Sequence, residues 1–152
     1  LLWANSQAIC TSFKVQLLNG IHAFGTTVTR GGTGADTFKA ALFEASASRG
    51  AGDTVYNTTG EVSGTGYSAG GVAFTWAAPN SSGTTAFSTP SASIVYTAVT
   101  LSTAFDAVLL YNSTQGDKAI GVFTFGSQTV TAGNFTLTMP TNDASTGLVR
   151  LA

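Results

Sequence analysis

Residues 104–125, which read AFDAVLLYNSTQGDKAIGVFTF, decide the fold. Two apolar runs, Ala104–Tyr111 and Ala119–Phe125, flank the polar segment Asn112–Lys118. Apolar runs of this length are typical of strands, and the Asn, Ser, Gly and Asp between them favour a tight turn. The stretch therefore predicts an antiparallel hairpin with its turn at residues 112–118.

Shorter strands are expected on both sides of this hairpin. Ser93–Leu101 (SIVYTAVTL) precedes it, and a short piece around Val130 follows it. In Asn134–Met139 (NFTLTM) every second residue is large and apolar, which is the period of a strand with one buried face. Leu148–Leu151 predicts a last short strand.

Upstream of the hairpin, Thr37–Ala45 (TFKAALFEA) predicts a strand with Phe38, Ala40 and Leu42 on one face. Because Ala, Leu, Glu and Lys also favour helices, a helix is an alternative for this segment. Val72–Ala77 (VAFTWA) predicts another short strand. Loops are expected over the segments rich in Gly, Ser and Asn, which are Ser46–Asp53, Tyr56–Gly71 and Ala78–Thr85.

The composition agrees with an all-β protein. Only 13 of the 152 residues are Asp, Glu, Lys or Arg, whereas Thr and Ser contribute 25 and 15 residues. Thr fits the half-buried surface of a sheet, and the 18 Gly residues supply turns and bulges. A single domain with roughly seven or eight short strands, spaced about ten residues apart, predicts a β-sandwich of jelly-roll type.

The N-terminal section departs from this pattern. In Thr11–Ile21 the residues Phe13, Leu17, Leu18 and Ile21 share one helical face, and Gly20 or Gly25 marks the helix end. We expect an apolar N-terminal arm over residues 1–12 and a β-sandwich domain with this helix over residues 13–152. The arm has neither the charged start nor the long apolar run of a signal peptide, and we expect it to dock on a neighbouring molecule.

Groups that carry chemistry are scarce. One His and one Cys, His22 and Cys10, cannot build a structural zinc site or an internal disulfide. The Gly-rich segment Tyr56–Gly71 lacks the Lys-Ser/Thr ending of a phosphate-binding loop. We therefore predict a protein that is not an enzyme, with no catalytic, cofactor-binding or metal-binding residue. A glycan hydrolase using Asp106 and Asp117 is the enzymatic alternative.

The same composition bears on partners. The net charge is −1 and no basic stripe occurs, so nucleic-acid binding is not expected. No apolar run reaches the ~20 residues of a membrane helix, so no membrane is expected either. Low charge weakens protection against association, which suggests a surface covered by protein partners. The residues predicted to contact them are Leu1, Leu2, Trp3, Ile9, Phe13 and Tyr67, with the Tyr56–Gly71 loop.

From Phe13 to Ala152 the chain resembles a family of small structural proteins of tailed bacteriophages. The segments that carry the resemblance are FKVQLLNGIHAFGTTV (13–28), DTFKAALFEASA (36–47), YNTTGEVSGTGYSAGGVAF (56–74), FDAVLLYNST (105–114) and KAIGVFTFGSQTVTAGNFTLTMPTNDASTGLVRLA (118–152).

The resemblance implies a virion structural protein without catalytic residues or cofactors. The role it points to is a capsid decoration (cement) protein on the capsid exterior, with the major capsid protein and further copies of itself, as a dimer or trimer, as partners. A tail or baseplate component of the virion is an alternative. Another is a surface carbohydrate-binding or adhesin module, for which Trp76 and Tyr67 would form an aromatic platform.

Overall fold

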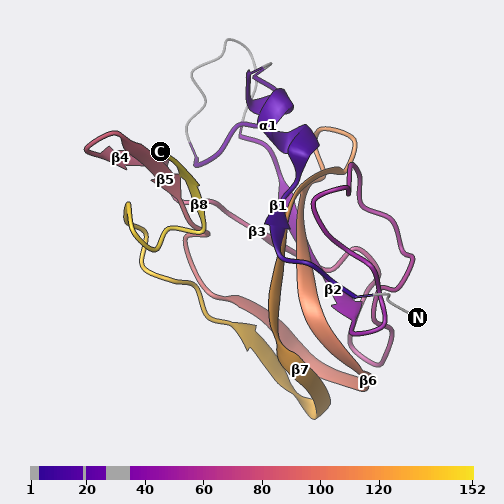
Figure 1. Cartoon of the computed structure of the whole chain (residues 1–152). Coiled ribbons are helices and arrows are strands. Elements are labelled where there is room, and N and C mark those ends of the chain that lie inside the picture. The colour runs from indigo at the N-terminus through magenta and orange to yellow at the C-terminus, as the bar shows by residue number, and fades with distance from the viewer. Residues whose placement is uncertain (1–3, 19, 27–34) are drawn as a thin grey trace.

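The computed structural model describes residues 4–18, 20–26 and 35–152. This part of the chain forms one helix, α1 (Thr11–Leu18), and eight strands: β1 (Ala8–Ile9), β2 (Phe38–Glu44), β3 (Val72–Phe74), β4 (Asn80–Ser82), β5 (Thr85–Ser88), β6 (Ile94–Asn112), β7 (Lys118–Leu137) and β8 (Val149–Leu151). The strands build two antiparallel sheets, ordered β1-β7-β6-β2-β3 and β4-β5-β8 (Figure 1). The all-β fold expected from the sequence is confirmed.

Strands β6 and β7 form one long hairpin where the sequence suggested several short strands. The register pairs Asn112 with Lys118 beside the turn and Ile94 with Leu137 at the far end. Residues 102–103 in β6 and 126–133 in β7 bridge the predicted segments. Backbone pairing does not require apolar side chains, so the polar residues between the apolar runs extend the strands. The turn itself lies where it was predicted.

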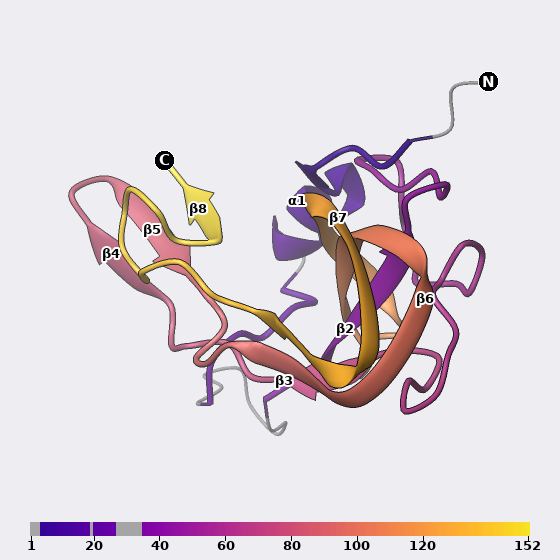
Figure 2. The same ribbon diagram turned by 90° about the horizontal axis from the view of Figure 1, so that it is seen from below.

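The hairpin is sharply bent in its middle. The pairing shifts register several times between Tyr96 and Ala107, and Ala98 and Ala132 have positive φ angles of 52° and 45°. Such irregularities are β-bulges, which bend a ribbon and increase its twist. Figure 2 shows β6 and β7 curving together, so that the two halves of the ribbon face each other.

Aromatic side chains fill the inner side of this bend. Phe105 packs edge-on against Phe135, with ring centroids 4.9 Å apart, and Phe125 lies 5.4 Å from Phe135. Tyr96 meets Phe135 from the same half of the ribbon at 6.1 Å. Because the bend brings distant parts of one hairpin together, it makes a core without a second large sheet.

Strand β2 is buried on both faces. Its residues Ala40, Ala41, Leu42 and Phe43 are all inaccessible to solvent, so the expected alternation of a buried and an open face is not observed. Its strand character is confirmed by pairing with β6 over its whole length. Beyond the short edge strand β3, the loop at residues 60–62 continues along β2. There the Glu44 N–H donates to the Gly60 carbonyl at 2.8 Å.

The N-terminal segment is built into the domain from Asn5 onward. The Asn5 amide donates to Glu44 O and to Asp106 Oδ1, and β1 pairs with β7 at Gly121 and Val122. The predicted helix starts at Thr11 but ends at Leu18, three residues before Ile21. Gly20, with φ of 68°, closes it by donating its N–H to the Leu17 carbonyl at 3.1 Å.

The smaller sheet includes a segment that was expected to be a loop. Asn80–Ser82 lies in the predicted loop 78–85 but pairs with β5 as strand β4. Gly83, with φ of 60°, forms the turn between them, and a Gly in this conformation allows a tight hairpin. The last strand, β8, was predicted correctly and pairs with the other edge of β5.

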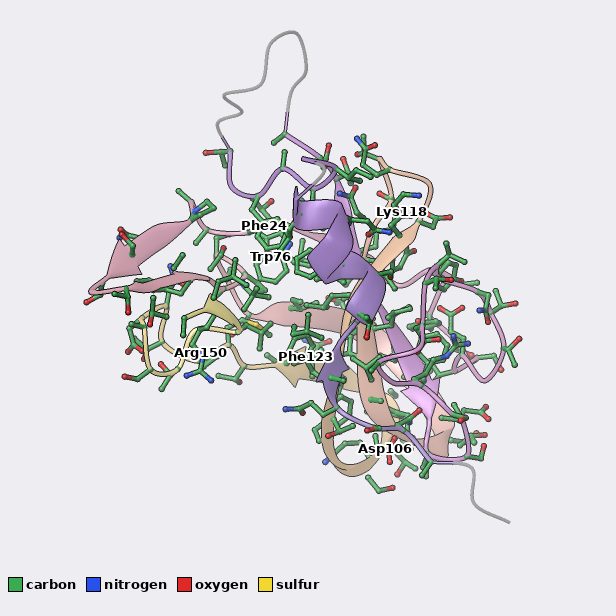
Figure 3. The ribbon with its side chains drawn as sticks, turned by 45° about the horizontal axis from the view of Figure 1, so that its top comes forward. Phe24, Trp76, Asp106, Lys118, Phe123 and Arg150 are labelled. Carbon is green, nitrogen blue, oxygen red and sulfur yellow. The ribbon has the colours of Figure 1, made fainter. Side chains whose placement is uncertain are left out.

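A second aromatic cluster joins the N-terminal section to the sheets. The Phe24 ring stacks on Trp76 at 4.3 Å, and both rings meet Phe38. Figure 3 shows Phe24 and Trp76 next to each other beside α1. Within the described residues, no helix has the length and apolar character needed to cross a bilayer.

Gly71, like Gly64 and Gly66, lies so close to a neighbouring backbone that only glycine fits. Gly71 has a φ of 74°, and a Cβ at this position would lie 1.7 Å from the Ala40 carbonyl oxygen. Gly116 in the hairpin turn has a similar φ of 66°, but a Cβ added there would meet no heavy atom within 4 Å.

We predict that Gly71→Ala lowers the free energy of unfolding by more than about 3 kcal/mol, because backbone strain and a steric clash add. Gly116→Ala is the matched control and should cost only about 1 kcal/mol, the strain alone. Urea denaturation followed by circular dichroism measures both. Equal losses for the two variants would contradict the close approach of Gly71 to β2.

Candidate functional site

The Gly-rich loop between β2 and β3 is held by one carboxylate. Glu61 accepts hydrogen bonds from the Tyr56 hydroxyl at 2.6 Å, the Tyr67 hydroxyl at 2.7 Å and the Gly70 N–H at 2.8 Å. Hydrogen bonds to an ionised acceptor are stronger than those between neutral groups. Glu61 therefore draws three separate points of the loop 56–71 together.

The other bonds of the tyrosines fasten this loop to the large sheet. The Tyr67 hydroxyl accepts the Leu42 N–H at 3.0 Å, and the Tyr111 hydroxyl donates to the Gly70 carbonyl at 2.7 Å. Tyr96 stacks on Tyr67 at 6.0 Å, and its hydroxyl donates within the large sheet to the Ala40 carbonyl at 2.8 Å. The rings of Tyr56 and Tyr111 stack at 4.6 Å. All four tyrosines of the chain thus belong to one cluster, which we call the Glu61–tyrosine cluster.

The cluster keeps its phenols protonated. Burial raises the pKa of all four tyrosines, because removal from water disfavours the phenolate. For Tyr56 and Tyr67 the hydrogen bond to Glu61 raises the pKa further, and for Tyr96 the negative charge of Glu61 does so. For Tyr111 the charge of Asp117 is the second cause. Protonated phenols are the donors that the carboxylate and the carbonyls need.

A buried arginine fixes the neighbouring loop 45–53. The Arg49 guanidinium lies over the Phe43 ring at 4.2 Å and pairs with Asp53 at 3.0 Å. It also donates to Asn57 Oδ1 at 2.7 Å and to the Thr59 carbonyl at 2.5 Å. An open hollow lies beside it, lined by Ser46, Ala47, Ser48, Arg49, Asn57, Thr59 and Gly60. Arg49 thereby joins two loops at the same end of β2.

A third polar group ties the helix region to the hairpin turn. Asn112 is fully buried, and its amide donates to Asp36 Oδ2 at 2.8 Å and lies 3.0 Å from His22 Nδ1. Asp36 also accepts the Ala23 N–H at 2.9 Å. His22 lies inside this network beside Phe13, with ring centroids 4.8 Å apart.

An apolar cleft of about 190 Å³ separates α1 from the smaller sheet. Phe13, Leu17 and Phe24 line one side, and Phe87, Val149 and Leu151 line the other. Leu151 is 53% exposed at its rim. A second apolar groove of about 170 Å³ lies inside the hairpin bend, between Val108, Leu110 and Phe123 on one side and the paired residues Ile94 and Leu137, with Met139 and Leu148, on the other.

The predicted contact residues fall into different environments. Phe13 is only 1% exposed, so the expectation that it is available on the surface is wrong: its ring packs against His22 and Phe24. Tyr67 is half-buried and its hydroxyl is engaged by Glu61 and Leu42. Ile9 is half-buried in β1. Leu1, Leu2 and Trp3 lie outside the described residues.

The residues weighed for other functions are separated or buried. Trp76 is 1% exposed, so Trp76 and Tyr67 do not form an exposed aromatic platform. Asp106 accepts the Asn5 amide at 2.5 Å in one half of β6, whereas Asp117 lies in the turn at the end of the hairpin. Figure 3 shows Lys118, the neighbour of Asp117, near the hairpin turn and Asp106 well apart from it, toward the bend. Three or more metal-ligating side chains do not gather anywhere in the described ranges.

Sequence reasoning missed Glu61 and Arg49, the two residues that organise the loops. A single acidic residue inside a run of Gly, Ser and Thr, with tyrosines five residues before and six residues after it, is the signal that could have identified Glu61. Comparison with protein-family models, curated proteins and solved structures found no match to this chain.

The two Glu61-bound tyrosines allow a matched test of the cluster. Tyr67→Phe removes two hydrogen bonds and leaves the Leu42 N–H without its acceptor, so we expect a loss of about 2 kcal/mol in unfolding free energy. Tyr56→Phe removes one bond and should cost about 1 kcal/mol. Urea titrations of both variants measure the difference. An equal or reversed order would contradict the role assigned to the Tyr67 hydroxyl.

The raised tyrosine pKa values predict instability in alkali. Unfolded tyrosines ionise near pH 10, whereas the folded ones do so at higher pH, so the stabilisation is complete below about pH 10 and is lost as the pH rises further. Ultraviolet absorbance of tyrosinate should therefore appear together with the loss of β circular dichroism. Four phenols that ionise near pH 10 in a protein that remains folded would contradict this prediction.

Proposed function

We propose that this protein is a non-enzymatic structural protein of a tailed-bacteriophage virion, a decoration (cement) protein that binds the outside of the capsid lattice. Two independent points support the proposal. The sequence from Phe13 to Ala152 resembles small virion structural proteins of such phages. The side chains most capable of chemistry, among them Glu61, Arg49 and Asp36, are engaged in holding loops in place.

The observation that carries the proposal is the Glu61–tyrosine cluster. A loop of Gly, Ser and Thr would lose much conformational freedom on binding a partner, which weakens binding. Here three hydrogen bonds to Glu61 and one from Tyr111 to Gly70 fix the loop 56–71 beforehand. A loop ordered in advance is suited to bind a repetitive protein surface.

The exposed side chains of this loop indicate how it would bind. Ser63, Thr65, Ser68 and Ala69 are exposed, and none of them carries a charge. Contacts through hydroxyl groups and backbone are weakly screened by salt, unlike contacts between surface charges. A decoration protein that binds only the assembled lattice stabilises the capsid by mass action, without any chemical step.

The first experiment is a cryo-electron microscopy map of the virion that carries this chain. We expect density of this fold on the capsid exterior, with the loop 56–71 against the major capsid protein. Density in the tail or baseplate would contradict capsid decoration and would support the alternative of a tail or baseplate component. Absence of the chain from the particle would contradict a virion role altogether.

A binding assay tests the loop itself. In Ser63→Arg/Ser68→Arg two bulky charges replace exposed hydroxyls, and we expect at least about tenfold weaker binding to capsids, because unpaired charges must lose water at the interface. The matched control Ser81→Arg/Ser82→Arg places the same charges on the exposed strand β4. Co-sedimentation with capsids measures both, and circular dichroism shows that both are folded. Equal binding by the two variants would contradict the loop contact.

A further inference from the structure

The outer edge of β7 is covered only near the hairpin turn. β6 pairs with one side of this 20-residue strand along its length, whereas the other side meets Val55 at Lys118, Cys10 at Ile120 and β1 at Gly121 and Val122. The Gln7 side chain extends this cover by accepting the Thr124 N–H at 2.9 Å. From Phe125 to Leu137, no strand of the described chain lies beside this edge, as Figure 2 shows for the bent half of β7.

This edge also lacks the usual protection against pairing. Edge strands are normally short, or carry Lys, other charges or Pro that prevent another strand from pairing with them. Here no residue from Ala119 to Asn142 is charged, and the first proline, Pro140, comes after the strand has ended. The polar loops of this chain are held by many hydrogen bonds, whereas the backbone groups along this β7 edge have no partner strand. We take the contrast to indicate that another molecule covers the edge in the assembled protein.

The strand that fits this edge best is the same edge of a second copy. The other outer strands of the two sheets, β1, β3, β4 and β8, have two or three residues each. They are too short to cover the edge from Phe125 to Leu137. The part of β6 that β2 does not reach, residues 94–104, is bridged by the loop 56–71 at Thr65 and Thr100, so among the described strands β7 keeps the longest uncovered edge.

The side chains are suited to such self-pairing. Ser127, Thr129 and Thr131 follow one another at every second position, and all three are exposed. In an antiparallel pair centred on Thr129, Ser127 of one copy faces Thr131 of the other. Hydroxyl pairs across strands are favourable, and an uncharged strand brings no like charges together. A two-fold axis through Thr129 closes the assembly at two copies.

We propose that the outer edge of β7 over residues 126–132 pairs antiparallel with the same edge of a second copy, so that two large sheets become one continuous sheet in a dimer. The proposal deepens the proposed function by naming the surface through which copies associate. The proposed function supplies only the place where the dimer would act, because the dimer itself forms in solution without a capsid.

A charge exchange tests this interface. Ser127→Lys/Thr131→Lys puts like charges opposite each other across the two-fold axis, and Ser127→Glu/Thr131→Glu does the same with negative charge. The matched control Ser102→Lys/Thr103→Lys places two lysines on exposed positions of β6 in the same bend. Sedimentation velocity measures the oligomeric state of each protein, and thermal denaturation shows that each is folded.

We expect a dimer for the wild type and for the control, and dimerisation at least about 100-fold weaker for the lysine and the glutamate variants. An equimolar mixture of the lysine and glutamate variants should restore the dimer, because opposite charges then face each other. A wild-type protein that is still monomeric at about 100 µM would have a dimer dissociation constant too weak for a specific interface, and this result overturns the proposal. So does a lysine variant that remains dimeric, or a mixture that stays monomeric.

Capsid co-sedimentation on the same proteins separates this inference from the proposed function. A wild type that is dimeric in solution but does not bind capsids contradicts decoration and leaves the β7 interface supported. A wild type that binds capsids as a monomer contradicts the interface and leaves decoration supported.

Discussion

The bend in the β6–β7 hairpin is the constraint on which the remainder of the structure depends. A flat two-stranded ribbon of this length would leave one apolar face in water, and isolated ribbons are at best marginally stable. The bulges marked by Ala98 and Ala132 fold the ribbon onto itself, so that Phe105 and Phe135 meet at 4.9 Å. The energetic gain comes from burying these rings, and it outweighs the strain of two alanines with positive φ.

The bend also determines where the long loops must go. β2 pairs with only one half of β6, and its outer edge is completed by β3 and by the loop at residues 60–62. This loop is rich in glycine and has few apolar side chains to bury, so hydrogen bonds have to order it. One carboxylate, Glu61, accepts three of them, and the tyrosines that donate or stack also contact the core. Core and loop are therefore stabilised by the same residues.

The distribution of charge follows from this arrangement. Arg49 and Asp36 are buried and bonded, so these two charged groups serve connections in the interior. Many of the exposed positions are Ser, Thr or Gly, and the long edge of β7 has no charged residue after Lys118. A protein with such a surface gains little from long-range electrostatic attraction and depends on close geometric fit. That property is consistent with assembly into a regular structure.

The sequence alone was sufficient for the fold class, the positions of β2 and β8, the apolar runs of β6 and β7 and the hairpin turn at 112–118, because these depend on local periodicity and on turn-forming residues. It missed β1, β4 and β5. It also records how few His, Cys and charged residues the chain has. It did not reveal that the strands join into one bent ribbon, since bulges depend on contacts such as Phe105 with Phe135 that lie far apart in sequence. Nor did it reveal Glu61 as the centre of the loop, or Phe13 as buried. The partners of Glu61 are positioned by hydrogen bonds to β2 and β6, and Phe13 is buried by contacts with Phe24 and His22. Tertiary structure decided these points because burial and hydrogen bonding are properties of neighbours in space, whereas the sequence records only neighbours along the chain.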